Sequence, residues 1–338
     1  MPYVSALGGV IFLLLFTLGP LHWVSVGAPW VPIAIAFAVI PLIDAWVGAP
    51  KHPTSGSFTS AWLRWVPRVQ LPAQAILVLH ALAVAPTLTW PELIVFAAAV
   101  GTITGGVGIT IAHELTHRES RIDRAIAKAL LVSVAYGHFT VEHVRGHHVR
   151  VGTPDDPATA PHGMSVYRFI VRSVVGSFRH AWKLEAMRLR HAGRSPFGVR
   201  NWVLTGTALS LALFAVAFTF SGAKGAVLMA IQAAWAIALL EVINYIEHYG
   251  LMRRRVGSAL EPVRPEHSWN ADYTVSNWIL FNLQLHSDHH ARMERPYEQL
   301  RSITSAPQLP AGYPAMVLLA LVPPAWFAVM HRRLPETA

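Results

Sequence analysis

Long uncharged apolar runs, separated by polar connectors, dominate the pattern of hydrophobic and polar positions along this chain of 338 residues. A helix that spans a bilayer needs about 20 predominantly apolar residues. Several runs approach or reach this length, and the shorter ones need a few interfacial residues to complete a span. The clearest runs cover residues 5–26, 30–43, 71–86, 93–112, 202–220 and 226–240. The pattern therefore predicts an all-α chain with six transmembrane helices.

Composition supports a membrane protein, because 53% of the residues are hydrophobic and only 13% are charged, against roughly 25% charged in soluble domains. The first run lacks a preceding basic stretch and a following A-x-A-like cleavage site, which favours a retained anchor over a signal peptide. We see no internal repeat and no low-complexity tract. The chain is therefore expected to form one domain over residues 1–338.

Basic residues divide the connectors into two kinds. The connectors at residues 26–29, 87–92 and 221–225 hold only Lys224, and the other 26 of the 27 Lys and Arg lie at 51–68, at 118–200 and after position 252. Because cytoplasmic loops are enriched in Lys and Arg, those three regions are expected in the cytoplasm, with both termini there. The last apolar run, 314–330, is interrupted by Pro323 and Pro324 and followed by Arg332 and Arg333. Crossing would expose these arginines outside, so this run is expected to lie against the bundle or at the interface.

The absence of cysteine from the sequence excludes several kinds of chemistry. Disulfides, iron–sulfur clusters, heme–thiolate ligation and a fused rubredoxin-type domain all need thiolate sulfur. Any electrons must therefore come from a separate protein. The net charge of +9 is explained by membrane topology, and no nucleic-acid partner is expected.

Half of the 18 histidines fall into four clusters on the predicted cytoplasmic side. On a helix, residues i and i+4 share a face, so three of these clusters can each offer two imidazoles to one point. Nine clustered imidazoles exceed what one metal accepts, since zinc usually binds four ligands and octahedral iron six. Two metals are therefore implied. The clustered histidines are His113, His117, His143, His147, His148, His248, His286, His289 and His290.

The first cluster, His113 to His117, also matches the H-E-x-x-H motif of zinc proteases, in which Glu114 would be the general base. A protease needs only one further ligand, so this alternative leaves most clustered histidines unexplained. A membrane metal transporter is a second alternative, but its histidines should lie within the apolar runs along a pathway.

Several polar residues beside the clusters are candidates for orienting a ligand through a hydrogen bond, as metal-binding histidines usually require. Alternatively, the acidic ones could offset the charge of the metals. These candidates are His138, His267, Glu114, Glu142, Glu247 and Asp288. The isolated histidines are expected at the surface or the membrane interface, and they are His22, His52, His80, His162, His180, His191 and His331.

Taken together, the four clusters resemble the bacterial membrane alkane hydroxylases (alkane 1-monooxygenases), relatives of the membrane fatty-acid desaturases. The boxes that carry the resemblance are H-E-L-T-H at 113–117, E-H-V-R-G-H-H at 142–148, N-Y-I-E-H-Y-G at 244–250 and L-Q-L-H-S-D-H-H at 283–290. Segments 153–157, 265–270 and 307–310 match as well, so the resemblance runs from about Pro41 nearly to the C-terminus. The box at 244–250 is the specific one, because desaturases lack it.

The resemblance implies two non-heme irons held by the nine clustered histidines, in a multi-pass protein of the bacterial inner membrane. It also implies O₂-dependent hydroxylation of the terminal carbon of n-alkanes, with electrons from rubredoxin and, upstream, rubredoxin reductase and NAD(P)H. A xylene-type methyl hydroxylase and an acyl-chain desaturase or epoxidase remain alternatives. The rubredoxin is expected to be acidic, because basic residues lie near the histidines. These are Arg118, Arg121, Arg124, Lys128, Arg145 and Arg150.

A linear alkane has no polar group, so its selection must depend on the shape of an apolar channel. Ala34, Ala36 and Ala38 lie along the second predicted helix, and Ala36 precedes Asp44 by eight residues. At a rise of 1.5 Å per residue this is roughly 12 Å along the helix. Ala36 is therefore a candidate wall of a substrate channel. The alternative is that these small residues only allow close helix packing.

Overall fold

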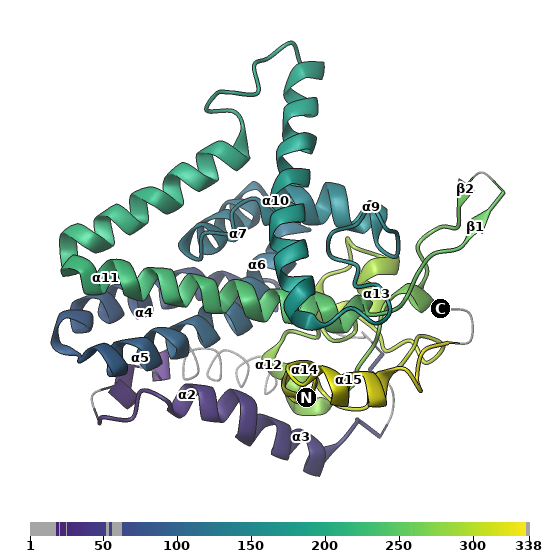
Figure 1. Cartoon of the computed structure of the whole chain (residues 1–338), viewed down its shortest axis with the longest axis horizontal. Helices are drawn as coiled ribbons and strands as arrows, with labels where there is room; N and C mark the ends of the chain where they lie inside the picture. The colour runs from purple at the N-terminus through teal and green to yellow at the C-terminus, as the bar shows by residue number, and fades with distance from the viewer. Residues whose placement is uncertain are drawn as a thin grey trace. The chain divides into compact units, whose positions relative to one another are not determined.

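The computed structural model describes residues 18–19, 21–24, 26–51, 54–55, 63–257 and 259–335 (Figure 1). Most of the expected N-terminal anchor, and also His52, lie outside the described residues. The chain divides into two compact units. Unit 1 comprises Met1–Val39, Phe58–Thr140 and Glu185–Leu240, and unit 2 comprises Ile40–Ser57, Val141–Leu184 and Glu241–Ala338.

Helices make up most of the described chain, as predicted. The N-terminal ones are α2 (Val31–Ala34), η1 (Ile35–Val39), α3 (Ile40–Val47), η2 (Val66–Val69), α4 (Gln70–Val84), η3 (Ala85–Thr87), α5 (Trp90–Ile103), η4 (Thr104–Ile109), α6 (Thr110–Thr116) and α7 (Arg121–Ser133). Next come α8 (Phe139–Glu142), η5 (His143–His147), α9 (His148–Arg150), α10 (Val166–His191) and α11 (Trp202–His248). The remainder are η6 (Pro265–His267), α12 (Thr274–Ile279), α13 (His286–Ala291), η7 (Tyr297–Gln299), α14 (Tyr313–Ala320) and α15 (Pro323–Met330). The described strands, β1 (Arg255–Val256) and β2 (Ala259–Leu260), form one antiparallel hairpin.

Three described helices are long and apolar enough to cross a membrane: Val66–Thr87, Trp90–Thr116 and Trp202–His248. They contain four of the six predicted runs, because 202–220 and 226–240 both fall within α11. The run at 30–43 forms the shorter apolar helix Val31–Val47. The membrane character of the chain is therefore supported by its described helices.

The long helix α11 consists of two arms that meet at Gly222. This residue has φ 62° and ψ −154°, a combination that is open almost only to glycine because it has no Cβ. The arms, 202–221 and 223–248, each reach the roughly 20 residues of a membrane span, and Figure 1 shows the sharp corner between them. Ser221 Oγ fixes the corner by donating to the carbonyl oxygen of Leu82 at 2.6 Å.

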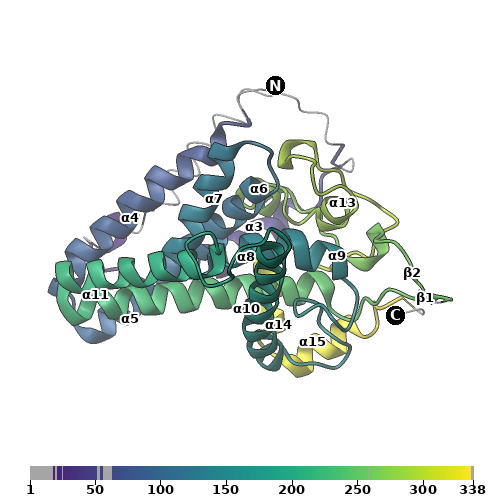
Figure 2. The ribbon, with the colours of Figure 1, turned by 90° about the horizontal axis from the view of Figure 1, so that it is seen from above.

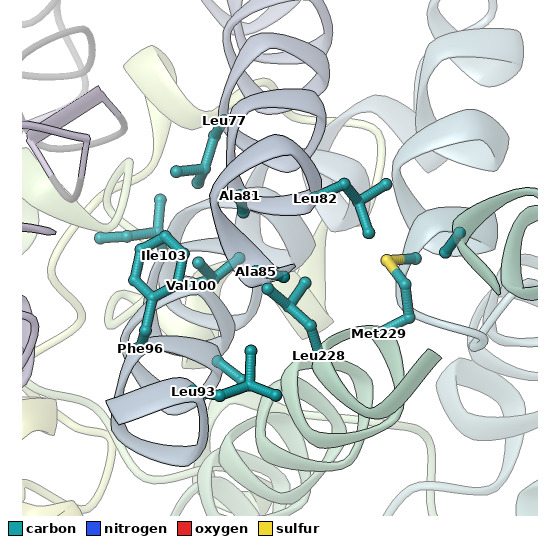
Figure 3. Packing of buried hydrophobic residues seen from close by; sticks show 12 residues of the cluster. Leu77, Ala81, Leu82, Ala85, Leu93, Phe96, Val100, Ile103, Leu228 and Met229 are labelled. Atoms are coloured by element: carbon teal, nitrogen blue, oxygen red, sulfur yellow. The ribbon is translucent and has the colours of Figure 1, made fainter. Parts of the chain in front are cut away.

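Apolar side chains from α4, α5 and α11 form the core of unit 1 (Figure 3). Leu77, Phe96, Val100 and Leu228 are each fully buried there. Glycines bring the backbones of α5 and η4 close to α11. A Cβ added to Gly105 would lie 2.7 Å from Cα of Ala236, so only glycine permits this approach.

Unit 2 contains most of α10 and the end of α11, together with short helices and loops that buried polar contacts hold in place. Asp44 caps α12, because its Oδ1 accepts from the backbone N–H groups of Val275 and Ser276, each at 3.1 Å, which otherwise lack helical partners. The final apolar run forms α14 and α15, eight residues each, which follow one another across a bend (Figures 1 and 2). Each is about 12 Å long, too short to cross a bilayer.

Candidate metal centre

Seven of the nine clustered histidines belong to unit 2, where they come from η5, α9, the end of α11 and α13. The other two, His113 and His117, lie in unit 1 at the end of α6, with ring centroids 5.1 Å apart. This is the i, i+4 pairing that the sequence predicts. His113 is buried and His117 is half-buried.

A π-helical turn in η5 changes which histidines of the second cluster face each other. The sequence pairs His143 with His147, but Nε2 of His143 instead lies 3.0 Å from Nε2 of His148. Because π-helical hydrogen bonds run from i to i+5, the wider turn brings residue i+5 to the position that i+4 takes in an α-helix. His147 instead lies with histidines of α11 and α13.

Four buried imidazoles converge through their Nε2 atoms: those of His147, His248, His286 and His290. We call these the four-histidine set. Nε2 of His290 lies 3.2 Å from that of His147 and 2.9 Å from that of His286, which lies 3.2 Å from that of His248. Each side chain comes from a buried position, at most 6% exposed.

Hydrogen bonding alone does not explain this convergence. A neutral imidazole Nε2 carries either one proton or one lone pair, so Nε2 of His290 can form only one of its two contacts as a good hydrogen bond. Metal–imidazole bonds of about 2.0–2.1 Å would place neighbouring ligand nitrogens roughly 3 Å apart around one ion. The observed distances of 2.9–3.2 Å fit that arrangement.

His143, His148 and His289 converge in the same way, and we call them the three-histidine set. Nε2 of His148 lies 3.0 Å from that of His143 and 3.1 Å from that of His289. Nε2 of His148 thus lies close to two other imidazole nitrogens, the arrangement expected for ligands of one metal ion. The alternation within α13 explains the division, because His286 and His290 share one face while His289 points to the other set.

Asp156, in the loop before α10, orients His147 of the four-histidine set. We assigned it no role from the sequence. Its Oδ2 lies 2.9 Å from Nδ1 of His147 and also accepts from the hydroxyl of Thr159 at 2.6 Å. Burial would raise the pKa of Asp156, but the charge and hydrogen bond of His147, with the Thr159 hydroxyl, outweigh burial and lower this pKa. The carboxylate thus stays ionised and holds Nδ1 protonated, which directs Nε2 of His147 toward the other imidazoles.

Arg172 of α10 holds the loop that carries Asp156. Its guanidinium donates to the carbonyl oxygens of Thr159 at 2.8 Å and of Asp156 at 3.1 Å. The position of the carboxylate is therefore fixed by the fold rather than by the histidine alone.

Glu247 reaches the four-histidine set directly. Its Oε2 lies 3.2 Å from Nε2 of His286, the same atom that faces the other imidazoles. Its Oε1 accepts from the hydroxyl of Tyr313 at 2.9 Å. Tyr313 is fully buried and lies 66 residues from Glu247, so no local sequence signal could have identified it.

Glu142 and Glu114 were also predicted to orient a ligand histidine. In the structure, Glu142 contacts a histidine outside the clusters and Glu114 contacts an arginine. Glu142 Oε1 lies 3.0 Å from Nδ1 of His180, and burial raises the pKa of Glu142. His180, expected to be an isolated surface residue, in turn lies 2.7 Å from a guanidinium nitrogen of Arg150. In unit 1, Glu114 accepts from Arg118 at 2.9 Å.

Asp288 connects α13 to the segment that follows this helix in the chain. Its Oδ2 accepts from the backbone N–H of Arg301 at 2.9 Å and from the guanidinium of Arg295. This contact anchors the helix that carries three of the clustered histidines.

His138 and His267 are the remaining residues predicted to orient a ligand. Burial lowers the pKa of His138 to about 4, so this imidazole is neutral. The ring of His267 turns toward Glu261, with Nε2 3.1 Å from its Oε1. Its backbone carbonyl oxygen, rather than its ring, approaches Nδ1 of His248, at 3.5 Å.

The apolar helices and the converging imidazoles define an α-helical membrane protein with a histidine-rich metal centre. A family model described as fatty acid desaturase matches residues 88–332. Two relatives from Pseudomonas aeruginosa are named alkane 1-monooxygenase 2 and alkane 1-monooxygenase 1. The first is 40% identical, over 91% of this chain and 86% of the relative, and the second is 42% identical, over 88% and 81%. The chain therefore belongs to the fatty acid desaturase family, and within it to the alkane 1-monooxygenases.

A more distant relative bears on one of the alternatives. The hydroxylase component of a xylene/toluene monooxygenase from Pseudomonas putida is 30% identical, over 68% of this chain and 61% of the relative. The alkane 1-monooxygenases match more of the chain at higher identity. The prediction of an enzyme of this family is confirmed.

Proposed function

We propose that this chain hydroxylates the terminal carbon of n-alkanes with O₂ at a non-heme di-iron centre in the bacterial inner membrane. The observation that carries the proposal is the convergence of Nε2 atoms in two separate histidine sets, with N···N distances of 2.9–3.2 Å. Imidazole is a suitable ligand for iron. Relatives named alkane 1-monooxygenase support the substrate class.

The four-histidine set would hold one iron and the three-histidine set the other. His113 and His117 stay predicted ligands of the di-iron centre, as the resemblance implies. When bound, the irons supply the activation of O₂ that an unactivated C–H bond requires. The protein holds the ligands through Asp156 and Glu247. Because the histidines of unit 2 are buried, it also keeps water away from the reacting bond.

The same proposal includes the membrane arrangement and the electron donor. Six transmembrane helices in one domain over residues 1–338, with both termini in the cytoplasm, would follow from the distribution of Lys and Arg. Rubredoxin, reduced by its NAD(P)H-dependent reductase, would dock on the basic cytoplasmic side. Arg121 and Arg124 of α7 are exposed and suit an acidic partner.

Product analysis with purified, iron-loaded protein tests the proposal against both alternatives. Octane, p-xylene and a saturated acyl substrate are supplied separately with ¹⁸O₂ and reduced rubredoxin. We expect 1-octanol that carries ¹⁸O as the main product. A preference for xylene would favour the methyl hydroxylase, and an unsaturated or epoxidised acyl chain would favour the desaturase or epoxidase. No oxygenated or unsaturated product from any substrate would contradict the proposed function.

A further inference from the structure

Two histidines of unit 2 that the sequence places at the surface or the membrane interface lie against each other. His162 and His331, both exposed, have ring centroids 4.1 Å apart. His331 follows α15 directly, and His162 lies in the loop before α10. Both belong to unit 2.

A buried tyrosine connects this pair to the proposed iron ligand His248. Tyr249 is the next residue in the chain and is fully buried. Its hydroxyl accepts from the backbone N–H of Gly163 at 2.9 Å. The hydroxyl keeps its one proton, which it can donate across the contact of 2.7 Å to Nε2 of His331 when that imidazole is neutral with its proton on Nδ1.

Aromatic rings surround Tyr249 and extend the connection. Its ring centroid lies 5.1 Å from that of Tyr245 and 5.4 Å from that of Trp326. The indole N–H of the buried Trp269 donates to the backbone carbonyl of Tyr249 at 2.9 Å. Oxidisable side chains thus run without interruption from the residue after His248 to an exposed imidazole.

A phenol hydrogen-bonded to a neutral imidazole is easier to oxidise than an isolated phenol, because its proton leaves to the base together with the electron. Tyr249 is the tyrosine of this cluster with such a base. Tyr245 donates instead to the backbone carbonyl oxygen of Met164, at 2.8 Å. A carbonyl is far too weak a base to keep the proton.

We propose that Tyr249 and His331 form a redox relay that carries an oxidising equivalent from the metal centre to the surface when no substrate C–H bond is in reach. Tyr249 gives one electron to the oxidised centre and its hydroxyl proton to Nε2 of His331, leaving a neutral tyrosyl radical and an imidazolium. A one-electron carrier protein or a small-molecule reductant at the exposed imidazoles returns the electron, and His331 returns the proton. The relay protects oxidisable side chains near the irons. It rests on the proposed function, because O₂ activation is the source of the oxidising equivalent.

The test exposes iron-loaded protein to O₂ and reduced rubredoxin without alkane, and compares Tyr249→Phe with Tyr245→Phe. Each variant loses one hydroxyl, Tyr245→Phe within the last turn of α11 and Tyr249→Phe just after its end, but only Tyr249→Phe loses the hydroxyl that faces a base. We expect a tyrosyl radical by electron paramagnetic resonance in the wild type and in Tyr245→Phe, and none in Tyr249→Phe. Mass spectrometry should show oxidised ligand histidines accumulating several times faster in Tyr249→Phe. Equal radical yields and equal oxidation in all three proteins would overturn the relay.

Because Tyr249→Phe changes a buried residue and could affect folding, a second variant changes the exposed residue His331 instead. His331→Gln replaces the exposed base by a side chain that cannot take up the proton, and we expect it to lower the radical yield as Tyr249→Phe does. Unchanged radical yield in His331→Gln would overturn the role of this imidazole. Wild-type protein that forms alcohol from octane but shows no radical would overturn the relay alone. Wild-type protein that forms no alcohol would overturn the proposed function and the relay with it.

Discussion

At the scale of single residues, a buried carboxylate fixes the direction of one proposed ligand, His147. Asp156 is fully buried and touches no proposed metal position, but it lies 2.9 Å from Nδ1 of His147. Its neighbour Asp155 is exposed. Both residues are aspartates, but only Asp156 contacts a proposed iron ligand, His147.

Replacing Asp156 by Asn should weaken iron binding by about 10- to 100-fold, the usual cost of losing such a supporting contact. Asn keeps the size of the side chain but removes the charge that holds Nδ1 of His147 protonated. Iron retained during titration with a chelator measures the effect. Asp155→Asn is the control and should bind iron like the wild type, and equal affinities for the two variants would contradict the assignment.

His248→Ala should abolish turnover and reduce the iron content to about one per chain, because the four-histidine set then lacks one of its few ligands. The helical circular dichroism should remain. His191→Ala, which removes the exposed histidine at the end of α10, should keep both irons and full activity. Full activity in His248→Ala would remove this residue from the proposed ligands.

The sequence could identify the clustered histidines, but only part of their grouping. His286 and His290 face each other at 2.9 Å, as an i, i+4 pair should. His143 and His147 have stacked rings 5.3 Å apart, but they join different sets because η5 is a π-helical turn. The sequence does not reveal this turn in advance. Asp156 was missed because an irregular loop, rather than helical periodicity, returns it to His147. Tyr313 was missed because it lies 66 residues from its partner Glu247.

At the scale of helices, close approach of backbones holds unit 1 together. Gly105 of η4 faces the backbone of Ala236 in α11, whereas a Cβ on the adjacent Gly106 would meet no heavy atom within 4 Å. Small residues commonly allow such approach between membrane helices. These two glycines thus form a matched pair for testing the packing.

Gly105→Ala should destabilise the fold by about 1–3 kcal/mol, because the added methyl group cannot fit without moving a backbone. Gly106→Ala should be neutral or slightly stabilising, since alanine is the better helix former. Denaturant-induced unfolding in detergent micelles measures both. Similar stability of the two variants would show that α11 does not lie against Gly105.

Apolar periodicity predicted where helices lie, because burial in lipid or core demands long apolar runs. The runs at 71–86 and 93–112 fall inside Val66–Thr87 and Trp90–Thr116. The corner of α11 is tighter than the predicted connector of residues 221–225, because Gly222 alone adopts a non-helical conformation. The sequence shows that residue 222 is a glycine, but it does not reveal the conformation of this residue.

At the scale of the whole molecule, the proposed substrate channel is the feature with the clearest functional consequence. Ala36 is buried, at 8% exposure, in the π-helical turn η1, eight residues before the Asp44 that caps α12. Ala36→Trp should keep activity on octane and lose the longer alkanes, because a bulky ring shortens an apolar channel. Product yields over alkanes of increasing length measure this. An unchanged profile in the folded variant would assign Ala36 to helix packing.

The identity and number of the bound metals decide whether this chain is a di-iron enzyme, because two histidine sets can hold two ions and the proposed chemistry requires iron. Elemental analysis of purified protein, normalised to chain concentration, is the measurement. We predict about two irons per chain and little zinc. One zinc per chain without iron would contradict it.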